Sequence, residues 1–314
     1  MASLPAMRAA YYSRFGEPAD VIEVGERPRP EITADHLLMR VRAAAAGFWD
    51  IKQIRGLFGS KFAMPAIPGY EVAGVVERAP EGSEFREGDE VLASPPFPGG
   101  AFAEYAVART NRAARKPDTI DFTAAAALPV AATTAYEGIV DRGRLRSGET
   151  VLITAASGGV GSFGVQIAAS QGARVFVVAG AASHDLLREL GAAATYDYHD
   201  SDWADRARAD ADGGVDLLFD PAGRETRERA IGAVRGGGRA YFIADEPGEL
   251  PEGITGEFFS SVPTSARLEA VARLVAAGSV TPAIDAVYTL ENTAQALSHV
   301  AGRHSRGRVC ISVE

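Results

Sequence analysis

The clearest pattern of apolar and polar positions lies near the middle of the chain. Residues 151–155 form a largely apolar, partly β-branched run, which is typical of a strand buried on both faces. From residue 160 to residue 169 the apolar positions recur at helical spacing, and Gly172 is placed to end that helix in a left-handed conformation. The pattern predicts a strand, a tight turn and a helix.

Small residues occupy this turn at the spacing of a dinucleotide-binding fingerprint. Ala156, Gly158 and Gly161 stand where the fingerprint has its three glycines. Such residues let a pyrophosphate approach the backbone, and the open N–H groups at a helix start hold its negative charge. Residues 173–179 read as a second buried strand that completes the unit. We expect a nicotinamide dinucleotide site, against the alternative of a purely structural turn.

The end of the second strand bears on the choice between NAD and NADP. Gly180 stands where an NAD site usually has an acidic residue for the ribose 2′-hydroxyl. No Asp or Glu occurs between Gly172 and His184, and no basic residue stands beside Gly180. A small uncharged pocket over residues 180–183 can admit a 2′-phosphate, so we expect NADP. Ser183 can equally serve only as the cap of a helix over residues 185–190.

The first third of the chain predicts short strands joined by Gly/Pro turns, as in a compact barrel-like module. Asp50 is expected to cap a short helix that runs to Arg55. The expected strands are residues 7–12, 21–24, 37–46, 70–77, 90–93 and 102–107.

Beyond Asp121 the pattern changes to helices alternating with strands. An alanine-rich helix over residues 121–138, interrupted at Pro129, precedes the fingerprint unit. Alternation of this kind predicts an α/β fold with a parallel sheet covered on both faces, and the C-terminal part is expected to rejoin the first module. The further expected helices are residues 226–234, 264–278 and 294–301, and the further strands are residues 195–198, 215–219, 239–244, 283–290 and 308–313.

Composition narrows the classes of partner and compartment. The 314 residues suffice for two domains, and the net charge of −9 opposes binding to a nucleic-acid backbone. The single cysteine, Cys310, excludes an internal disulfide and a thiolate zinc cluster, which suits a reducing cytosol. Residues 1–10 lack the apolar core of a signal peptide, and no run is long enough to span a membrane. We expect a cytoplasmic protein with no membrane partner.

An ordered set of motifs runs through nearly the whole chain. It resembles the medium-chain dehydrogenase/reductase superfamily, and most closely its zinc-independent quinone oxidoreductase (zeta-crystallin-like) branch. The resemblance implies a GroES-like catalytic domain over residues 1–122 and 261–314, a Rossmann domain over residues 123–260, and a homodimer. The motifs are residues 67–74, 87–92, 100–105, 128–129 with 133–136, 155–161, 197–198, 216–223 and 307–309.

The resemblance also bears on metal content. Zinc members of the superfamily place their catalytic ligands at the positions that here contain Gly47, Tyr70 and Val130. None of these binds zinc, and the cysteine-rich loop for structural zinc is absent. A nicotinamide can still give hydride to an acceptor that is already electron-poor, such as a quinone or a carbonyl-conjugated alkene. The resemblance therefore implies an NADPH-dependent reductase without zinc.

Cofactor contacts are carried over from the family position by position. Ser183 and Tyr198 would border the adenosine phosphate, and Arg308 would reach the cofactor from the C-terminal segment. The nicotinamide and pyrophosphate contacts would come from Thr134, Ser157, Gly158, Gly159, Val160, Gly161, Asp220, Gly223 and Ile243, with Gly180 at the ribose.

Residues for the acceptor are less specific. Tyr70 is a candidate proton donor, since it stands at a metal-ligand position, and Asp50 with Lys52 can form a polar pair near the acceptor. Packing explains Tyr70, helix capping explains Asp50 and solvent exposure explains Lys52 as alternatives. A flat conjugated substrate would suit the aromatic residues, whose alternative role is core packing. These are Phe48, Trp49, Phe58, Phe62, Phe97, Phe258 and Phe259.

Three functions remain open from the sequence. The first is an NADPH-dependent reductase of quinones or conjugated carbonyl compounds. The second is an enoyl reductase or tailoring reductase of polyketide-like secondary metabolites. The third is an NADPH-binding protein with little catalysis, because the usual polar residues of the active site are missing.

Overall fold

The chain divides into two compact units. The computed structural model describes residues 5–33, 35–59, 62–302 and 305–313. The first unit comprises Met1–Val130, Pro263–Ala276 and Pro282–Glu314, and the second comprises Ala131–Val262 and Ala277–Thr281. Relative to the boundaries expected from the sequence, residues 123–130 lie with the first unit, and residues 261–262 and 277–281 lie with the second.

The second unit is built on a six-stranded parallel sheet. Its strand order is β10-β9-β8-β11-β12-β13, and each neighbouring pair is parallel. This is the doubly wound order, in which the direction of winding reverses between β8 and β11. The strands are β8 (Thr150–Ile153), β9 (Arg174–Val178), β10 (Ala194–Tyr196), β11 (Val215–Asp220), β12 (Val234–Phe242) and β13 (Thr255–Phe258). The expected α/β class with a Rossmann sheet is confirmed.

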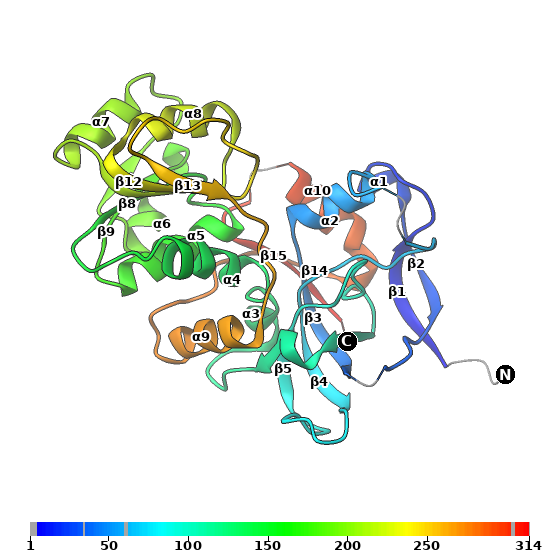
Figure 1. The fold of residues 1–314 in the computed structure, drawn as a ribbon. Coiled ribbons are helices and arrows are strands. Elements are labelled where there is room, and N and C mark those ends of the chain that lie inside the picture. The colour runs from blue at the N-terminus through cyan, green and yellow to red at the C-terminus, as the bar shows by residue number, and fades with distance from the viewer. Residues whose placement is uncertain (1–4, 34, 60–61, 303–304, 314) are drawn as a thin grey trace. The chain divides into compact units, whose positions relative to one another are not determined.

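Helices cover both faces of this sheet. Figure 1 shows α7 (Trp203–Asp210) and α8 (Arg224–Gly232) on one face, and α4 (Ala131–Tyr136) and α5 (Gly159–Ser170) on the other. A π-helix, η2 (Glu137–Arg142), continues α4, and a short helix, η3 (Ala181–Ser183), leads into α6 (His184–Glu189). The core between these layers holds the fully buried side chains of Phe163, Phe176, Trp203, Phe219 and Phe242.

The first unit is β-rich and mostly antiparallel. A sheet of order β14-β15-β3-β4-β5-β7 is extended by β6, which pairs with β3, and β1 pairs with β2. Because β15 pairs with β3, the C-terminal strands complete a sheet begun by the N-terminal ones. The strands are β1 (Ala6–Tyr12), β2 (Ile22–Pro28), β3 (His36–Ala46), β4 (Val72–Arg78), β5 (Glu90–Ala93), β6 (Tyr105–Arg109), β7 (Ala113–Arg115), β14 (Ile284–Thr289) and β15 (Arg308–Ser312).

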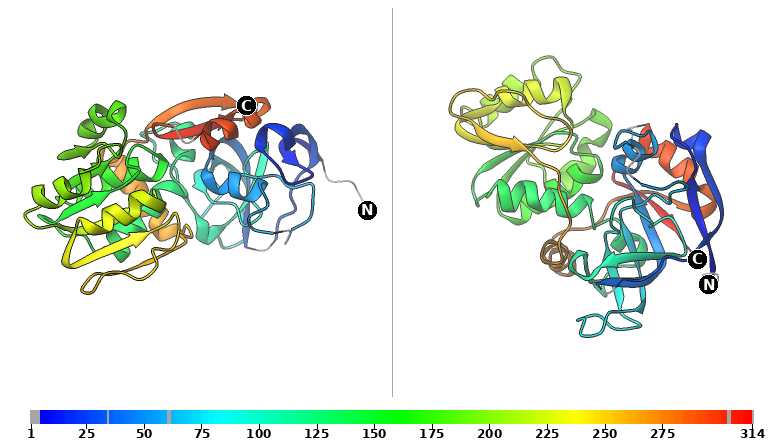
Figure 2. Two further views of the ribbon diagram at one scale, coloured as in Figure 1. Left: turned by 90° about the horizontal axis from the view of Figure 1, so that it is seen from above. Right: turned by 45° about the vertical axis from the view of Figure 1, so that its right-hand side comes forward.

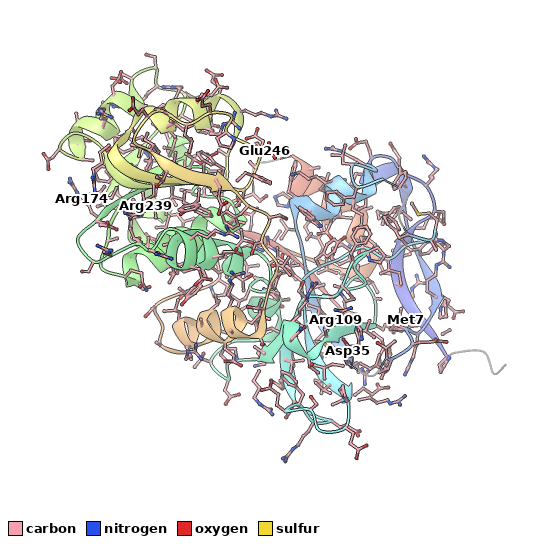
Figure 3. All side chains as sticks on the ribbon, in the orientation of Figure 1. Met7, Asp35, Arg109, Arg174, Arg239 and Glu246 are labelled. Atoms are coloured by element: carbon pink, nitrogen blue, oxygen red, sulfur yellow. The ribbon has the colours of Figure 1, made fainter. Side chains whose placement is uncertain are left out.

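Short helices pack on these strands. In Figure 2, α10 (Thr293–Ala301) lies beside α1 (Pro18–Val21) and α2 (Phe48–Ile54), with which it is in contact. Figure 3 labels Asp35 and Arg109, whose exposed ion pair stands where β3 and β6 begin to pair. The remaining helices are η1 (Thr110–Arg112), α3 (Phe122–Ala126), α9 (Ser265–Ala276) and η4 (Leu290–Asn292).

Several expected elements are wrong in detail. Residues 21–24 are not one strand, because Pro18 begins a helical turn that ends at Val21 and the strand starts only at Ile22. The strand expected over residues 102–107 starts at Tyr105. Gly172 has φ +75° and ends α5, as expected. Among the described residues, no helix has both the length and the apolar character needed to cross a bilayer.

Candidate active site

The fingerprint turn has the geometry of an anion site. Gly158 is the N-cap of α5 and supplies no side-chain acceptor, so the first N–H groups of the helix stay open. At Gly161 an added Cβ would lie 2.3 Å from the Ala155 carbonyl oxygen, so the helix start packs directly on the turn. The predicted residues Ser157 to Gly161 thus form a helix N-terminus that fits the pyrophosphate of a dinucleotide.

Ala155 is a strained residue that sequence reasoning missed. Its φ is +43°, and its carbonyl oxygen accepts a hydrogen bond from the Gly158 N–H at 3.0 Å. A left-handed conformation costs a non-glycine residue about 1–2 kcal/mol. The backbone of the turn is therefore held by the surrounding structure rather than by the preference of its residue.

At the switch point of the sheet, Thr154 and Asp220 are joined by a hydrogen bond. The Thr154 hydroxyl donates to Asp220, and the Asp220 carboxylate also accepts from the Gly223 N–H at 3.1 Å. Burial raises the pKa of Asp220. The Ile243 N–H donates to the Asp220 carbonyl oxygen at 3.3 Å, which links the ends of β11 and β12. Ligands of doubly wound sheets bind at this reversal, so the predicted Asp220, Gly223 and Ile243 are brought together there.

The loop after β9 contacts the turn after β10. A Cβ at Gly180 would lie 3.5 Å from the ring of Tyr198. Tyr198 is 44% exposed. The Asp197 carboxylate accepts from the Ala181 N–H at 3.1 Å. Ser183 is buried and stands at the N-cap of α6, but its side chain makes no capping hydrogen bond. Sequence reasoning included Asp197 only as part of a motif and missed its contact with Ala181, because the two residues follow different strands, β10 and β9.

In the first unit, Asp50 is buried and bonded to two backbone N–H groups. One carboxylate oxygen accepts from Gly47 at 2.8 Å and the other from Gly69 at 3.0 Å. Burial raises the pKa of Asp50 to about 7. The expectation that Asp50 begins the helix is wrong, since Gly47 is the N-cap and Asp50 is the third helical residue. No ion pair joins Lys52 to Asp50 in the described part of the chain.

Glu71 and Arg308 form a buried ion pair beside this aspartate. The Arg308 guanidinium donates to one Glu71 oxygen, and the other accepts from the Val130 N–H at 2.8 Å. Burial lowers the pKa of the Arg308 guanidinium. A Cβ at Gly47 would lie 3.7 Å from an Asp50 oxygen and 3.8 Å from a Glu71 oxygen. The two carboxylates therefore flank Gly47.

These contacts allow a test of whether the residues fit a catalytic metal. Positions 47, 70 and 130 contain a glycine, a tyrosine and a valine, none of which supplies a zinc-binding side chain. Within residues 5–33, 35–59, 62–302 and 305–313, no cluster of three or more His, Cys, Asp or Glu side chains could hold a metal ion. The residues present do not fit a catalytic zinc site.

Tyr70 belongs to a buried chain of hydrogen bonds. Its hydroxyl donates to the Gln53 side-chain oxygen, and the Gln53 amide donates at 2.8 Å to the Tyr12 hydroxyl and at 2.8 Å to the Pro98 carbonyl. Burial raises the pKa of the Tyr70 hydroxyl. The hydroxyl that was considered as a proton donor is thus committed to Gln53, a residue that sequence reasoning missed.

Aromatic rings gather near Tyr70 in the first unit. The rings of Trp49 and Phe58 are 4.5 Å apart, and the Tyr70 ring stands edge-on to Trp49 at 6.5 Å. Trp49 is 41% exposed and Phe97 is 44% exposed, so part of this group faces solvent. Phe62 and Phe97 form a second pair, edge-on at 5.1 Å. We call the two pairs, Trp49 with Phe58 and Phe62 with Phe97, the aromatic surface.

The other aromatic residues predicted to bind substrate are less open. Phe48 is partly buried and packs against the core of the first unit. Phe259 is buried in the second unit, where the Arg142 guanidinium lies 4.7 Å from its ring centre. Thr134, the predicted nicotinamide contact of α4, is also buried.

Comparisons with known proteins fit this arrangement. Residues 33–118 match the alcohol dehydrogenase GroES-like domain, and residues 190–311 match a domain described as zinc-binding dehydrogenase. The chain is 32% identical to the chloroplastic NADPH-dependent alkenal/one oxidoreductase of Arabidopsis thaliana, over 99% of this chain and 81% of that protein. The chain belongs to the medium-chain dehydrogenase/reductase superfamily.

Other members of the superfamily show a similar sequence identity to this chain. The quinone oxidoreductase of Rattus norvegicus is 29% identical over 94% of both chains. A crystal structure titled as an NAD-dependent alcohol dehydrogenase has a TM-score of 0.90 and 30% identity, covering 98% of this chain and all of that chain. The expected resemblance to the quinone oxidoreductase-like branch of the medium-chain dehydrogenases/reductases is confirmed, and the chain is an oxidoreductase.

Proposed function

We propose that this medium-chain reductase transfers hydride from NADPH to a quinone or a conjugated enone without zinc. The observation that carries the proposal is the set of side chains at positions 47, 70 and 130, which offers no metal ligands. Without a metal Lewis acid, the acceptor must already be electron-poor. The names of the Arabidopsis and rat relatives, an alkenal/one and a quinone oxidoreductase, support the same acceptor class.

Bound NADPH would supply the hydride, and the chain would supply binding and orientation. The open N–H groups at the start of α5 would hold the diphosphate. The Thr154–Asp220 hydrogen bond would keep the loop at the switch point in one conformation, with Gly223 at φ +72°. The aromatic surface would stack against a planar acceptor and exclude water from it. Arg308 stays a predicted cofactor contact.

We further propose that Tyr70 acts by position and that the product takes its proton from solvent. The Tyr70 hydroxyl donates to Gln53, and its ring stands edge-on to Trp49, so it fixes one side of the aromatic surface. The alternative role of Tyr70, as a proton donor, is tested by the variant Tyr70→Phe. We also propose a cytoplasmic location, since the single cysteine, Cys310, forms no disulfide. A homodimer is proposed only by analogy with other members of the superfamily.

A panel of acceptors tests the proposal through the loss of NADPH absorbance. We expect oxidation with quinones and α,β-unsaturated ketones, and none with a matched saturated ketone. The activity should persist after dialysis against a chelator, with metal analysis showing less than stoichiometric zinc. A strict requirement for zinc would contradict the proposal.

The same panel separates the alternatives. Oxidation with enoyl thioesters alone would favour an enoyl reductase of polyketide-like products. Binding of NADPH without oxidation by any acceptor would favour a binding protein. Either result would replace the proposed acceptor class.

A further inference from the structure

We propose that the imidazole of His199 binds the 2′-phosphate of NADP. This inference rests on the proposed function, because it assigns the residue that selects the cofactor. A 2′-phosphate needs a positively charged partner, and the loop of residues 180–183 contains none. Two residues of the same turn, Asp197 and Tyr198, contact both His199 and that loop.

The first of these residues is Asp197, which connects the imidazole to the loop. One Asp197 oxygen accepts from the backbone N–H of His199 at 2.9 Å and from its ring Nδ1 at 2.8 Å. The other oxygen accepts from the Ala181 N–H. These N–H groups lower the pKa of Asp197, so a carboxylate stays in place to orient the ring.

The second residue is Tyr198, which supports the ring from one side. The Tyr198 and His199 ring centres are 4.1 Å apart, and Tyr198 itself packs against Gly180. The imidazole is therefore held by a hydrogen bond at one edge and an aromatic ring at one face. Both supports belong to the turn that borders the position expected for the ribose.

The opposite edge of the imidazole is available to a ligand. Because Nδ1 donates to Asp197, the group left to bind a phosphate is Nε2, and the side chain is 70% exposed. No described group is bonded to Nε2. With a carboxylate at one edge and a phosphate at the other, both ring nitrogens would carry protons and donate.

Other basic side chains near this turn already have hydrogen-bond partners, either carboxylates, a hydroxyl or backbone carbonyl oxygens. Arg229 of α8 donates to the carbonyl oxygens of Tyr198 and Asp200, and Arg188 of α6 donates to Asp185 and Thr195. The Nε2 of His184 lies 3.0 Å from the Ala179 carbonyl. In α7, Arg206 pairs with Asp200 and Asp202. The nitrogens named here already have partners, whereas Nε2 of His199 has none among the described residues.

Calorimetry with nucleotide fragments tests the inference without turnover. The probes are adenosine 2′,5′-bisphosphate and 5′-AMP, used at about pH 6 and about pH 8. We expect His199→Gln to weaken the bisphosphate about tenfold and leave 5′-AMP unchanged, since one charge-assisted hydrogen bond is lost. In the wild type the preference should be stronger at about pH 6 than at about pH 8, because a phosphate binds an imidazole best when both ring nitrogens donate.

Two further variants sharpen the result. His199→Arg should keep the preference for the bisphosphate at the higher pH. His184→Gln is the matched control and should behave as the wild type. The inference is overturned if the wild type does not prefer the bisphosphate, if His199→Gln keeps the preference, or if only His184→Gln loses it.

Steady-state kinetics separates this inference from the proposed function. If quinones oxidise NADPH but His199→Gln keeps the wild-type ratio of kcat/KM for NADPH over NADH, the inference fails and the function stands. If no acceptor is reduced but His199→Gln loses bisphosphate binding, the inference stands and the function fails.

Discussion

The carboxylate of Glu71 and the guanidinium of Arg308 form an ion pair inside the first unit, although 237 positions separate them in the chain. β3 accounts for the contact, because it pairs with β4, which follows Glu71, and with β15, which begins at Arg308. The pair therefore forms only when the C-terminal strand β15 has joined the sheet of the first unit. Substitutions that break the pair should destabilise that unit.

Arg308→Met should destabilise the protein strongly, because it leaves the Glu71 carboxylate buried without its cation. A loss of about 3–5 kcal/mol in the free energy of unfolding is expected. Urea denaturation measures it. Arg55→Gln, which removes an exposed pair with Glu17, should change stability little. The double variant Glu71→Met with Arg308→Met should recover part of the loss. Equal effects of Arg308→Met and Arg55→Gln would contradict the prediction.

Asp50 predicts a stability that depends on pH. Burial raises its pKa in the folded chain to about 7, whereas an unfolded aspartate titrates near about 4. Because the pKa is raised on folding, the contribution of Asp50 to the free energy of unfolding is fully present below about pH 4 and is lost as the pH rises through about 7. The loss is of the order of 4 kcal/mol, at 1.36 kcal/mol per pKa unit.

Unfolding curves of the wild type and Asp50→Asn, collected across this range, isolate the effect. The difference between the two should change with pH, since asparagine does not titrate. The exposed capping residue Asp121 is the control, and Asp121→Asn should keep the wild-type slope. A constant difference between wild type and Asp50→Asn would show that Asp50 has an ordinary pKa.

Tyr70→Phe distinguishes a positioning role from proton donation. Removing the hydroxyl leaves the buried Gln53 oxygen without its donor, which should cost about 1–3 kcal/mol of stability. We expect kcat with a quinone to stay within about threefold and KM to rise severalfold, since the aromatic surface loses a support. Tyr11→Phe, which removes a hydroxyl bonded to Glu23, is the control and should leave KM unchanged. A large fall in kcat with little loss of stability would instead make Tyr70 the donor.

Gly161→Ala should open the turn that precedes α5. The new Cβ would meet the Ala155 oxygen at 2.3 Å and the Ala156 Cα at 2.7 Å, both backbone atoms that cannot rotate away. We expect a loss of about 1–3 kcal/mol and no detectable dinucleotide binding by calorimetry. Gly232→Ala in α8 is the control, because a Cβ there meets nothing within 4 Å, and it should gain about 0.5–1 kcal/mol. Normal dinucleotide binding by Gly161→Ala would remove the turn from the site.

Elements that bury an apolar face could be predicted from the sequence, and elements that do not were missed. The buried run before the glycine turn gives β8 within two residues at either end, and the helical spacing after it gives α5 within one. In contrast, α7 buries only Trp203 and Ala207, and β13 is an edge strand that is largely exposed. Neither shows a periodic apolar pattern, because α7 contributes only two side chains to the core and β13 lies at the edge of the sheet.

In the candidate site, too, local features could be predicted from the sequence and contacts between separate elements could not. The helix start at the fingerprint is local, so the spacing of Ala156, Gly158 and Gly161 was enough to find it. The bond between Tyr70 and Gln53, and the reach of Asp197 to Ala181, join separate elements and depend on tertiary packing. Asp50 caps its helix from the third helical position, through the Gly47 N–H, and not from the N-cap position itself. Its second bond, from the Gly69 N–H, joins a separate segment and also depends on tertiary packing.

The position of β15 between β14 and β3 has a consequence for synthesis of the chain. Residues 43–46 leave the ribosome before the parallel sheet is translated, whereas their partner residues 309–312 emerge only after it. The six strands of the parallel sheet, in contrast, are all complete by Phe258 and can assemble beforehand. During translation the nascent chain therefore exposes an unpaired strand edge at residues 43–46. A chaperone can cover this edge, or a neighbouring nascent chain can pair with it.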